Sequence, residues 1–214
     1  MKKGQKILTG ALWALTVVAM MSVIGAGLVK RQRAREHAEA LEVFGEVPPF
    51  ALVDQDGGRV TEQTLRGRPW VADFVFTRCA GPCPLMTGRM AGLQNQIPTG
   101  VRLVTISVDP EFDTPAVLKA YAKEHGADEA RWKFLTGEKD AVFKLAKGML
   151  VTALPAQGDQ PIIHTEKFIL VDGAGQIRNV YESNQPDELA KLVKDTQRLS
   201  KEVRTASIGA AGAR

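Results

Sequence analysis

The chain has 214 residues, of which 44% are hydrophobic, and a formal net charge of +4. This length and composition allow one globular domain with extensions. Seven basic but only two acidic residues lie within the first 40 positions, so the remainder, with 21 basic and 22 acidic residues, is close to neutral. It has no basic stripe with interleaved aromatic residues, which argues against a nucleic-acid-binding protein.

The first distinctive segment is an uncharged apolar run at residues 7–29. At 1.5 Å per residue, its 23 residues would form a helix about 34 Å long, enough to cross a hydrocarbon core of about 30 Å. We therefore predict a transmembrane anchor at 7–29, a short N-terminal segment at 1–6 and a charged linker at 30–45. A cleaved signal peptide is the alternative, but this run exceeds the usual h-region of about 7 to 15 residues. Basic residues flank the run on both sides, so charge alone does not orient it.

The loop that contains both cysteines is predicted to join a strand to a helix. Ahead of it, residues 48–54 and 59–60 flank the turn signal Asp56-Gly57-Gly58 and predict a hairpin. The run WVADFVFT at 70–77 is almost entirely apolar, as expected for a strand buried on both faces. After the cysteines, apolar residues at helical spacing predict a helix with Pro84 at its first position; they are Leu85, Met86, Met90, Leu93 and Ile97.

Strands and helices continue to alternate through the rest of the chain. Residues 101–109 form the next predicted strand, and Thr114 and Pro115 are suited to begin a helix that ends at His125-Gly126. The further predicted elements are a strand at 132–136, a helix at 139–149, a loop from Leu150 to Ile163, a strand at 164–172, its hairpin partner at 176–181, and a helix at 186–203. This order predicts a three-layer α/β domain at 46–204, followed by a disordered tail at 205–214.

Cys79 and Cys83 are the two cysteines of the chain and are separated by three residues. Cys83 is expected beside the N-terminus of the following helix, whose partial positive charge stabilises a thiolate. Two cysteines cannot form a Cys₄ or Cys₃His zinc site. A plain disulfide is an alternative for an exported domain, although such a short loop restrains little chain entropy. A redox-active dithiol and a pair of metal ligands are both open at this point.

One histidine could complete a metal site with the two cysteines. His37 lies in the predicted linker, and His125 is explained by its place at the end of a helix. His164 lies where the long loop meets a strand, so its side chain could lean over a neighbouring strand end; a core histidine is the alternative. Two thiolates and one imidazole make a soft three-coordinate set that suits copper, particularly Cu(I).

Three motifs occur in order along the chain: FVFTRCAGPCP, ISVDPEFDTP, and a histidine ahead of FILVDGAG. Together they resemble the Sco/SenC family of copper-handling proteins, and the resemblance covers about residues 45–203. It implies that Cys79, Cys83 and His164 match the family's three copper ligands. It also implies that Asp109 matches an acid near the metal that tunes the ligands or contacts a partner, although a simple turn residue explains Asp109 equally well.

The resemblance implies a fold, a location and a function as well. The expected fold is a thioredoxin-like, three-layer α/β domain with an N-terminal transmembrane helix. The expected location is the bacterial inner membrane, with residues 1–6 cytoplasmic and the domain in the periplasm. The expected function is that of a copper metallochaperone, not an enzyme, which delivers copper to the dinuclear copper centre of cytochrome c oxidase subunit II or a similar acceptor. A periplasmic copper donor or thiol reductant would be a further partner.

Two other functions are consistent with the cysteines. A thiol-disulfide oxidoreductase would reduce the cysteines of the copper acceptor, with Cys79 as the attacking thiolate and Cys83 as the resolving one. That chemistry needs no imidazole, so His164 discriminates between the two functions. A peroxiredoxin-like peroxidase is suggested by Thr77, two residues before Cys79, but it leaves Cys83 and His164 unexplained.

The sequence departs from the common family pattern at two places. The insert between the cysteines is Ala80-Gly81-Pro82, where the family often has an acidic residue, and Ile163 precedes the histidine, where it often has aspartate. Both changes reduce the negative charge near the metal, so we expect this chain to favour Cu(I) over Cu(II). Met86 and Met90 could add thioether ligands, but at their helical spacing core packing is the stronger interpretation.

Overall fold

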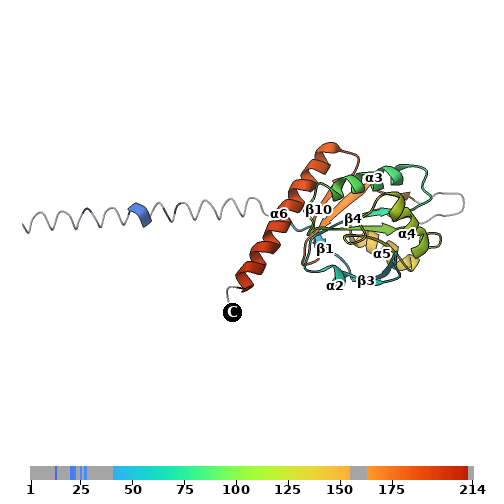
Figure 1. Cartoon of the computed structure of the whole chain (residues 1–214), viewed down its shortest axis with the longest axis horizontal. Coiled ribbons are helices and arrows are strands. Elements are labelled where there is room, and N and C mark those ends of the chain that lie inside the picture. Colours follow the sequence, from blue (N-terminus) through green and yellow to red (C-terminus); the bar gives the residue numbers. More distant parts are fainter. Residues whose placement is uncertain are drawn as a thin grey trace, which may run out of the picture. The chain divides into compact units, whose positions relative to one another are not determined.

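The chain divides into two units, Met1–Leu41 and Glu42–Arg214 (Figure 1). The computed structural model describes residues 13, 20–22, 25, 27, 41–154 and 163–211, without the side chains at 154, 163–164 and 204–211. The predicted segments 1–6, 7–29 and 30–45 therefore lie mostly outside the described residues, and those described within 7–29 are helical. None of the helices described here is both long and apolar enough to span a bilayer.

The second unit alternates strands and helices, as predicted. In chain order, its elements are β1 (Gly45–Glu46), β2 (Ala51–Asp54), β3 (Arg59–Thr61), α2 (Glu62–Leu65), β4 (Trp70–Val75), α3 (Pro82–Gln94), β5 (Arg102–Ser107), α4 (Pro115–Glu124), β6 (Trp132–Thr136), α5 (Lys139–Gly148), β7 (Ala153–Leu154), β8 (Ile163–His164), β9 (Lys167–Val171), β10 (Gln176–Glu182) and α6 (Pro186–Ala211).

Most of the described strands form one mixed sheet in the order β1-β10-β9-β4-β5-β6-β2-β3. β4, β5 and β6 are parallel, whereas β9 pairs antiparallel with β4, and β2 pairs antiparallel with β6. Every residue of β4 is buried, which agrees with the continuous apolar run that predicted a strand covered on both faces. β7 and β8 form a separate two-stranded ribbon, which joins the segment expected to be a loop to His164, the first residue of the predicted strand 164–172.

Helices cover both faces of this sheet, and Figure 1 shows α3 and α5 on opposite sides of it. On one side, α5 buries Val142 in the same core as Phe74 of β4. On the other side, the Tyr121 ring of α4 meets Phe134 of β6 edge-on, with ring centroids 6.2 Å apart. The Tyr121 hydroxyl also forms a hydrogen bond with Thr87 of α3. These layers confirm the predicted α/β architecture.

Local sequence signals explain two of the elements directly. Leu52 pairs with Val60 in the β2–β3 hairpin, which turns at Gly57 with φ of 80°, a left-handed conformation that glycine adopts without strain. At the start of α4, the Thr114 side chain accepts a hydrogen bond from the Val117 N–H, so Thr114 is the predicted N-cap.

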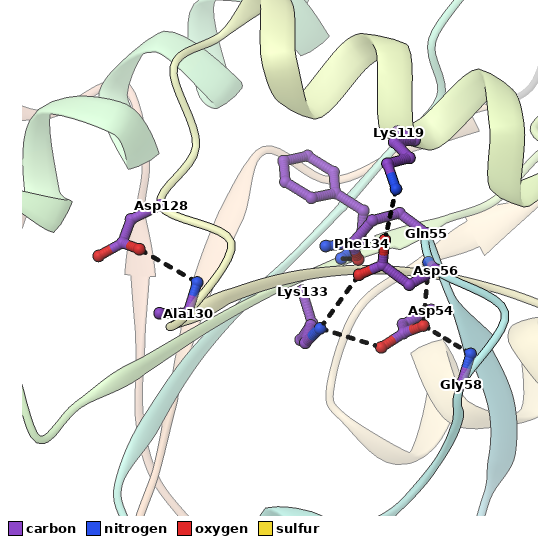
Figure 2. A network of polar contacts seen from close by, with 9 residues as sticks. All are labelled: Asp54, Gln55, Asp56, Gly58, Lys119, Asp128, Ala130, Lys133 and Phe134. Atoms are coloured by element: carbon purple, nitrogen blue, oxygen red, sulfur yellow. Dashed lines mark hydrogen bonds and ion pairs between the residues drawn. The ribbon is translucent and has the colours of Figure 1, made fainter.

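A buried carboxylate fastens the β2–β3 hairpin to β6 (Figure 2). Asp54 accepts hydrogen bonds from the backbone N–H groups of Asp56 and Gly58 at 3.0 and 2.7 Å. Its other carboxylate oxygen lies 3.1 Å from the ammonium group of Lys133. The Asp56 carboxylate binds both Lys133 and Lys119 of α4, but its side chain is 39% exposed, against 8% for Asp54. The Asp54 interactions are therefore the sheltered part of this network.

Helix α3 begins two residues earlier than predicted. Its N-cap is Gly81 and its first residue is Pro82, so Pro84 is not the first residue of the helix. Proline is well suited to this position because the first N–H of a helix has no intrahelical acceptor. As a consequence, Cys83 lies inside the first turn rather than ahead of it.

The C-terminal elements also differ from prediction in their limits. β9 begins at Lys167, whereas His164 belongs to the ribbon, because the Thr165 N–H bonds the Thr152 carbonyl at 3.0 Å and holds this segment outside the main sheet. α6 has helical backbone to Ala211, eight residues beyond its predicted end, and so includes most of the segment 205–214 for which disorder was expected.

Candidate metal site

The loop with both cysteines leaves the sheet at the carboxyl end of β4. Val75, the last residue of β4, pairs with Ser107, the last residue of β5, so the loop between β5 and α4 begins at the same edge. β9 is antiparallel to β4 and therefore begins at this edge too, at Lys167, three residues after His164. The topology thus brings the three sequence motifs to one edge of the sheet.

The two cysteines lie in different environments. Neither is in a disulfide, and Cys79 is partly exposed whereas Cys83 is fully buried. Burial, together with a hydrogen bond to Cys79, raises the pKa of the Cys83 thiol far above its usual range. The expectation that the helix N-terminus would stabilise a thiolate at Cys83 is therefore wrong, because the cost of removing the thiolate from water outweighs the helix dipole.

An ion pair connects the residue before Cys79 to the predicted acid. The Arg78 Nε lies 2.6 Å from Oδ2 of Asp109, and the Arg78 guanidinium lies over the Phe112 ring, 4.7 Å from its centroid. Asp109 is buried, and its hydrogen bond to the guanidinium raises the pKa of Arg78. The sequence placed Asp109 near the site, and the structure adds that it contacts the neighbour of Cys79 rather than a cysteine itself.

A second carboxylate, which the sequence did not single out, holds the same loop. Asp113 is fully buried and accepts hydrogen bonds from the Thr77 backbone N–H, at 3.1 Å, and from the Thr77 and Ser107 hydroxyls. Its spacing of four residues from Asp109, directly after a predicted strand, was the available signal. Together, Asp109 and Asp113 attach residues 77–78 to the loop between β5 and α4.

A third buried acid lies on the central strand. Asp73 of β4 has no exposed surface, and within the described chain neither carboxylate oxygen receives a hydrogen bond of good geometry. Burial raises the pKa of Asp73 to about 7, although the neighbouring Thr105 hydroxyl acts in the opposite direction. That hydroxyl already accepts a hydrogen bond from the Trp132 indole. The apolar run around Asp73 predicts its burial, but nothing in the sequence indicates how few hydrogen bonds the described residues offer its carboxylate.

Part of the predicted ligand set comes together in the structure. Cys79 and Cys83 form a hydrogen-bonded pair. His164 lies in β8, where it pairs with Ala153 of β7, but its side chain is outside the described set. Among the side chains that the structure describes, no three His, Cys, Asp or Glu residues gather into a metal-binding group. The set of Cys79, Cys83 and His164 therefore remains a prediction.

Other candidates from the sequence have structural explanations. Met86 and Met90 are fully buried in the core, as their spacing predicted. His125 is the C-cap of α4, and its ring lies against Tyr121 with centroids 4.4 Å apart. These contacts account for both methionines and for His125 without a metal.

A mixed α/β sheet with a free dithiol between a central strand and the following helix defines a thioredoxin-like protein. Within this class, the model of the SCO1/SenC family matches residues 39–200 of the chain. The chain belongs to the SCO1/SenC family.

Individual relatives agree with this assignment. The SCO1 protein homolog of Bacillus subtilis is 34% identical over 161 residues, covering 72% of this chain and 83% of that protein. BsSco, a member of the Sco family of cytochrome c oxidase assembly proteins in which a disulfide switch was identified, matches with a TM-score of 0.66 and 31% identity over 76% of this chain and 98% of its own. Bradyrhizobium japonicum ScoI with copper bound matches with a TM-score of 0.61 and 28% identity, covering 72% and 99%.

Proposed function

We propose that this protein is a copper metallochaperone for cytochrome c oxidase assembly. Copper is its cargo, held by Cys79, Cys83 and His164. The observation that carries the proposal is the pair of free, hydrogen-bonded thiols at the sheet edge where β9 also begins. The copper-bound relative ScoI supports the choice of metal, and BsSco supports a role in oxidase assembly.

The proposed ligands suit a soft, monovalent ion. Two thiol sulfurs and an imidazole nitrogen are donors that Cu(I) prefers, and burial of Cys83 limits competition from water. Because burial raises the pKa of Cys83, the metal must displace a proton from this thiol, so copper affinity should increase with pH. Arg78, Asp109 and Asp113 hold the cysteine loop in place without serving as ligands.

The location and the acceptor complete the proposal. The apolar run at 7–29 would anchor the chain in a bacterial inner membrane, with the domain in the periplasm. The acceptor would be subunit II of cytochrome c oxidase, whose dinuclear copper centre would receive the ion by ligand exchange. A periplasmic copper donor and a thiol reductant would then be required to reload and reduce the protein.

The asymmetry of the two cysteines also favours a second function, reduction of the acceptor's cysteines. The Cys79 thiolate would attack an acceptor disulfide, forming a mixed disulfide and releasing one acceptor thiolate. The Cys83 thiol would then pass its proton to the released acceptor thiolate, and its sulfur would attack the Cys79 sulfur, which releases the second acceptor thiolate and leaves a Cys79–Cys83 disulfide. The partial exposure of Cys79 and the burial of Cys83 match the attacking and resolving roles. A periplasmic dithiol would supply the two electrons that regenerate the pair.

Titration of the reduced full-length chain with Cu(I), in the presence of a competing chelator, tests the first function. We expect one Cu(I) per chain, and no tight binding after Cys79→Ser or Cys83→Ser. His164→Ala should weaken binding by more than about 100-fold, the upper range for losing a group that only orients a ligand. His125→Ala is the matched control, because His125 caps a helix, and it should bind as the parent does.

A parallel assay separates the two functions. The same variants are mixed with an oxidised peptide that carries the two cysteines of a copper acceptor, and the release of thiols is followed. If His164→Ala binds copper as tightly as the parent and reduces the peptide at the parental rate, the metallochaperone proposal is replaced by the reductase. If His164→Ala loses copper but the parent does not reduce the peptide, the reductase function is rejected.

A further inference from the structure

A hollow of about 800 Å³ lies between α5 and the segment that leads into β7. Three lysines line it, Lys139, Lys144 and Lys147, together with the apolar side chains of Phe143, Val151 and Ala153. Neither Cys79 nor Cys83 is among the described residues that line it. Phe143, Val151 and Ala153 give it an apolar floor, and Phe143 and Ala153 pack against the hydrophobic core. The floor therefore belongs to the stable part of the domain.

The rim of the hollow is positively charged. Lys139 is paired with Glu111 at 3.0 Å, but Lys144 and Lys147 are exposed and form no ion pair within the described part of the chain. Lys139 and Lys147 are eight positions apart on α5, which corresponds to about 12 Å along the helix, and Lys144 lies between them. One acid, Asp140, shares the rim. A single small anion could not reach charges spread over this distance.

Leu150 extends the apolar surface at the end of α5. It is 50% exposed and has a φ of 62°, the only positive φ among the described residues other than glycine. The Val151 N–H bonds the Ala146 carbonyl at 3.0 Å, so Leu150 occupies the position after the C-cap that glycine usually fills. A leucine in this conformation is strained, and half of its apolar side chain is exposed to water. Neither backbone preference nor hydration therefore accounts for a leucine at this position.

We propose that this hollow is a docking site for an acidic segment of a partner protein. The segment would insert an apolar side chain against Phe143 and Leu150 and direct carboxylates toward Lys144 and Lys147. The concave apolar floor fits an inserted side chain better than a flat lipid surface, and the length of the charged rim fits a peptide. The proposal does not depend on copper, because the residues that would contact the segment, Phe143, Leu150 and the two lysines, are not proposed copper ligands.

Selection from a random-peptide library on the copper-free, full-length chain tests this site. Enriched peptides should contain an apolar residue flanked by Asp or Glu. The double variant Lys144→Glu with Lys147→Glu should weaken their binding by about tenfold, with a reduced salt dependence. Lys123→Glu, an exposed lysine of α4, is the matched control and should retain parental affinity.

Leu150→Asn separates docking from folding. Asparagine tolerates the left-handed conformation better than leucine, so the midpoint of thermal unfolding should not fall, while peptide binding weakens about fivefold. The proposal is overturned if no acidic peptide is enriched or if binding survives both sets of changes. It is also overturned if these changes reduce binding only to vesicles of phosphatidylglycerol and phosphatidylethanolamine, since the surface would then contact a membrane. Because copper is absent throughout, these outcomes are independent of the Cu(I) titration.

Discussion

Asp73 should make the domain less stable at high pH, and Asp73→Asn should remove this effect. Burial raises the pKa of Asp73 from 3.8 to about 7 in the folded chain. Between these values the folded chain holds a proton that the unfolded chain has released, so stability falls as pH rises. Below pH 3.8 Asp73 is protonated in both the folded and the unfolded chain. Above about pH 7 it is ionised in both, so the loss of stability is complete above this pH. A difference of about 3 pH units corresponds to about 4 kcal/mol.

The free energy of unfolding of Asp73→Asn, minus that of the parent, should therefore rise with pH. Above neutral pH this difference should be about 4 kcal/mol larger than it is near pH 4. Urea unfolding of the reduced, metal-free full-length chain, followed by the fluorescence of the buried Trp70 and Trp132, measures both proteins from about pH 4 to about pH 9. Asp140→Asn, at an exposed position of α5, is the matched control. Parallel pH profiles for parent and Asp73→Asn would refute the reasoning, since they would mean that Asp73 ionises without cost in the folded chain.

Two further predictions concern the other buried carboxylates. Asp54→Ala should lower the free energy of unfolding, measured in urea, by about 3 kcal/mol, because two backbone N–H groups and Lys133 lose their buried acceptor. Asp56→Ala removes a side chain that is 39% exposed and should lower it by less than about 1 kcal/mol. Equal losses of unfolding free energy in the two variants would show that burial does not determine how much these contacts stabilise the fold. Asp113→Ala should cost about 3 kcal/mol and speed hydrogen exchange at the Thr77 amide, since its three hydrogen bonds hold the cysteine loop. Unchanged exchange at Thr77 would contradict the proposed anchoring.

Features that depend on neighbouring residues could be predicted from the sequence. The apolar run of β4, the Thr114 cap of α4 and the hairpin at Gly57 all arise from local patterns, and all three appear in the structure. The spacing of Cys79 and Cys83, and their place between a strand and a helix, also follow from local patterns. The start of α3 was missed because Pro82 and Pro84 are both acceptable in a first turn.

The site could be predicted only in part, because its properties depend on distant segments. Cys83 was expected to be a stabilised thiolate, but the surrounding core removes it from water and raises its pKa instead. β7 and the first residue of β8 fall in the predicted loop, and His164 falls in the predicted strand of the main sheet, because two-residue strands leave no recognisable pattern. The role of Asp113 depends on Thr77, which is 36 residues away in the sequence.

The sequence by itself therefore determined the family, the order of the elements and the residues proposed to hold copper, because motifs and periodicity are carried by neighbouring positions. Only the tertiary structure decided which of the two thiols is buried, which acids are satisfied and where the charged hollow lies. Asp73 and Asp113 are both fully buried acids, yet within the described chain the Asp73 carboxylate receives no hydrogen bond of good geometry, whereas Asp113 accepts several. That difference comes from the atoms that folding brings to each carboxylate, and these atoms belong to residues far away in the chain.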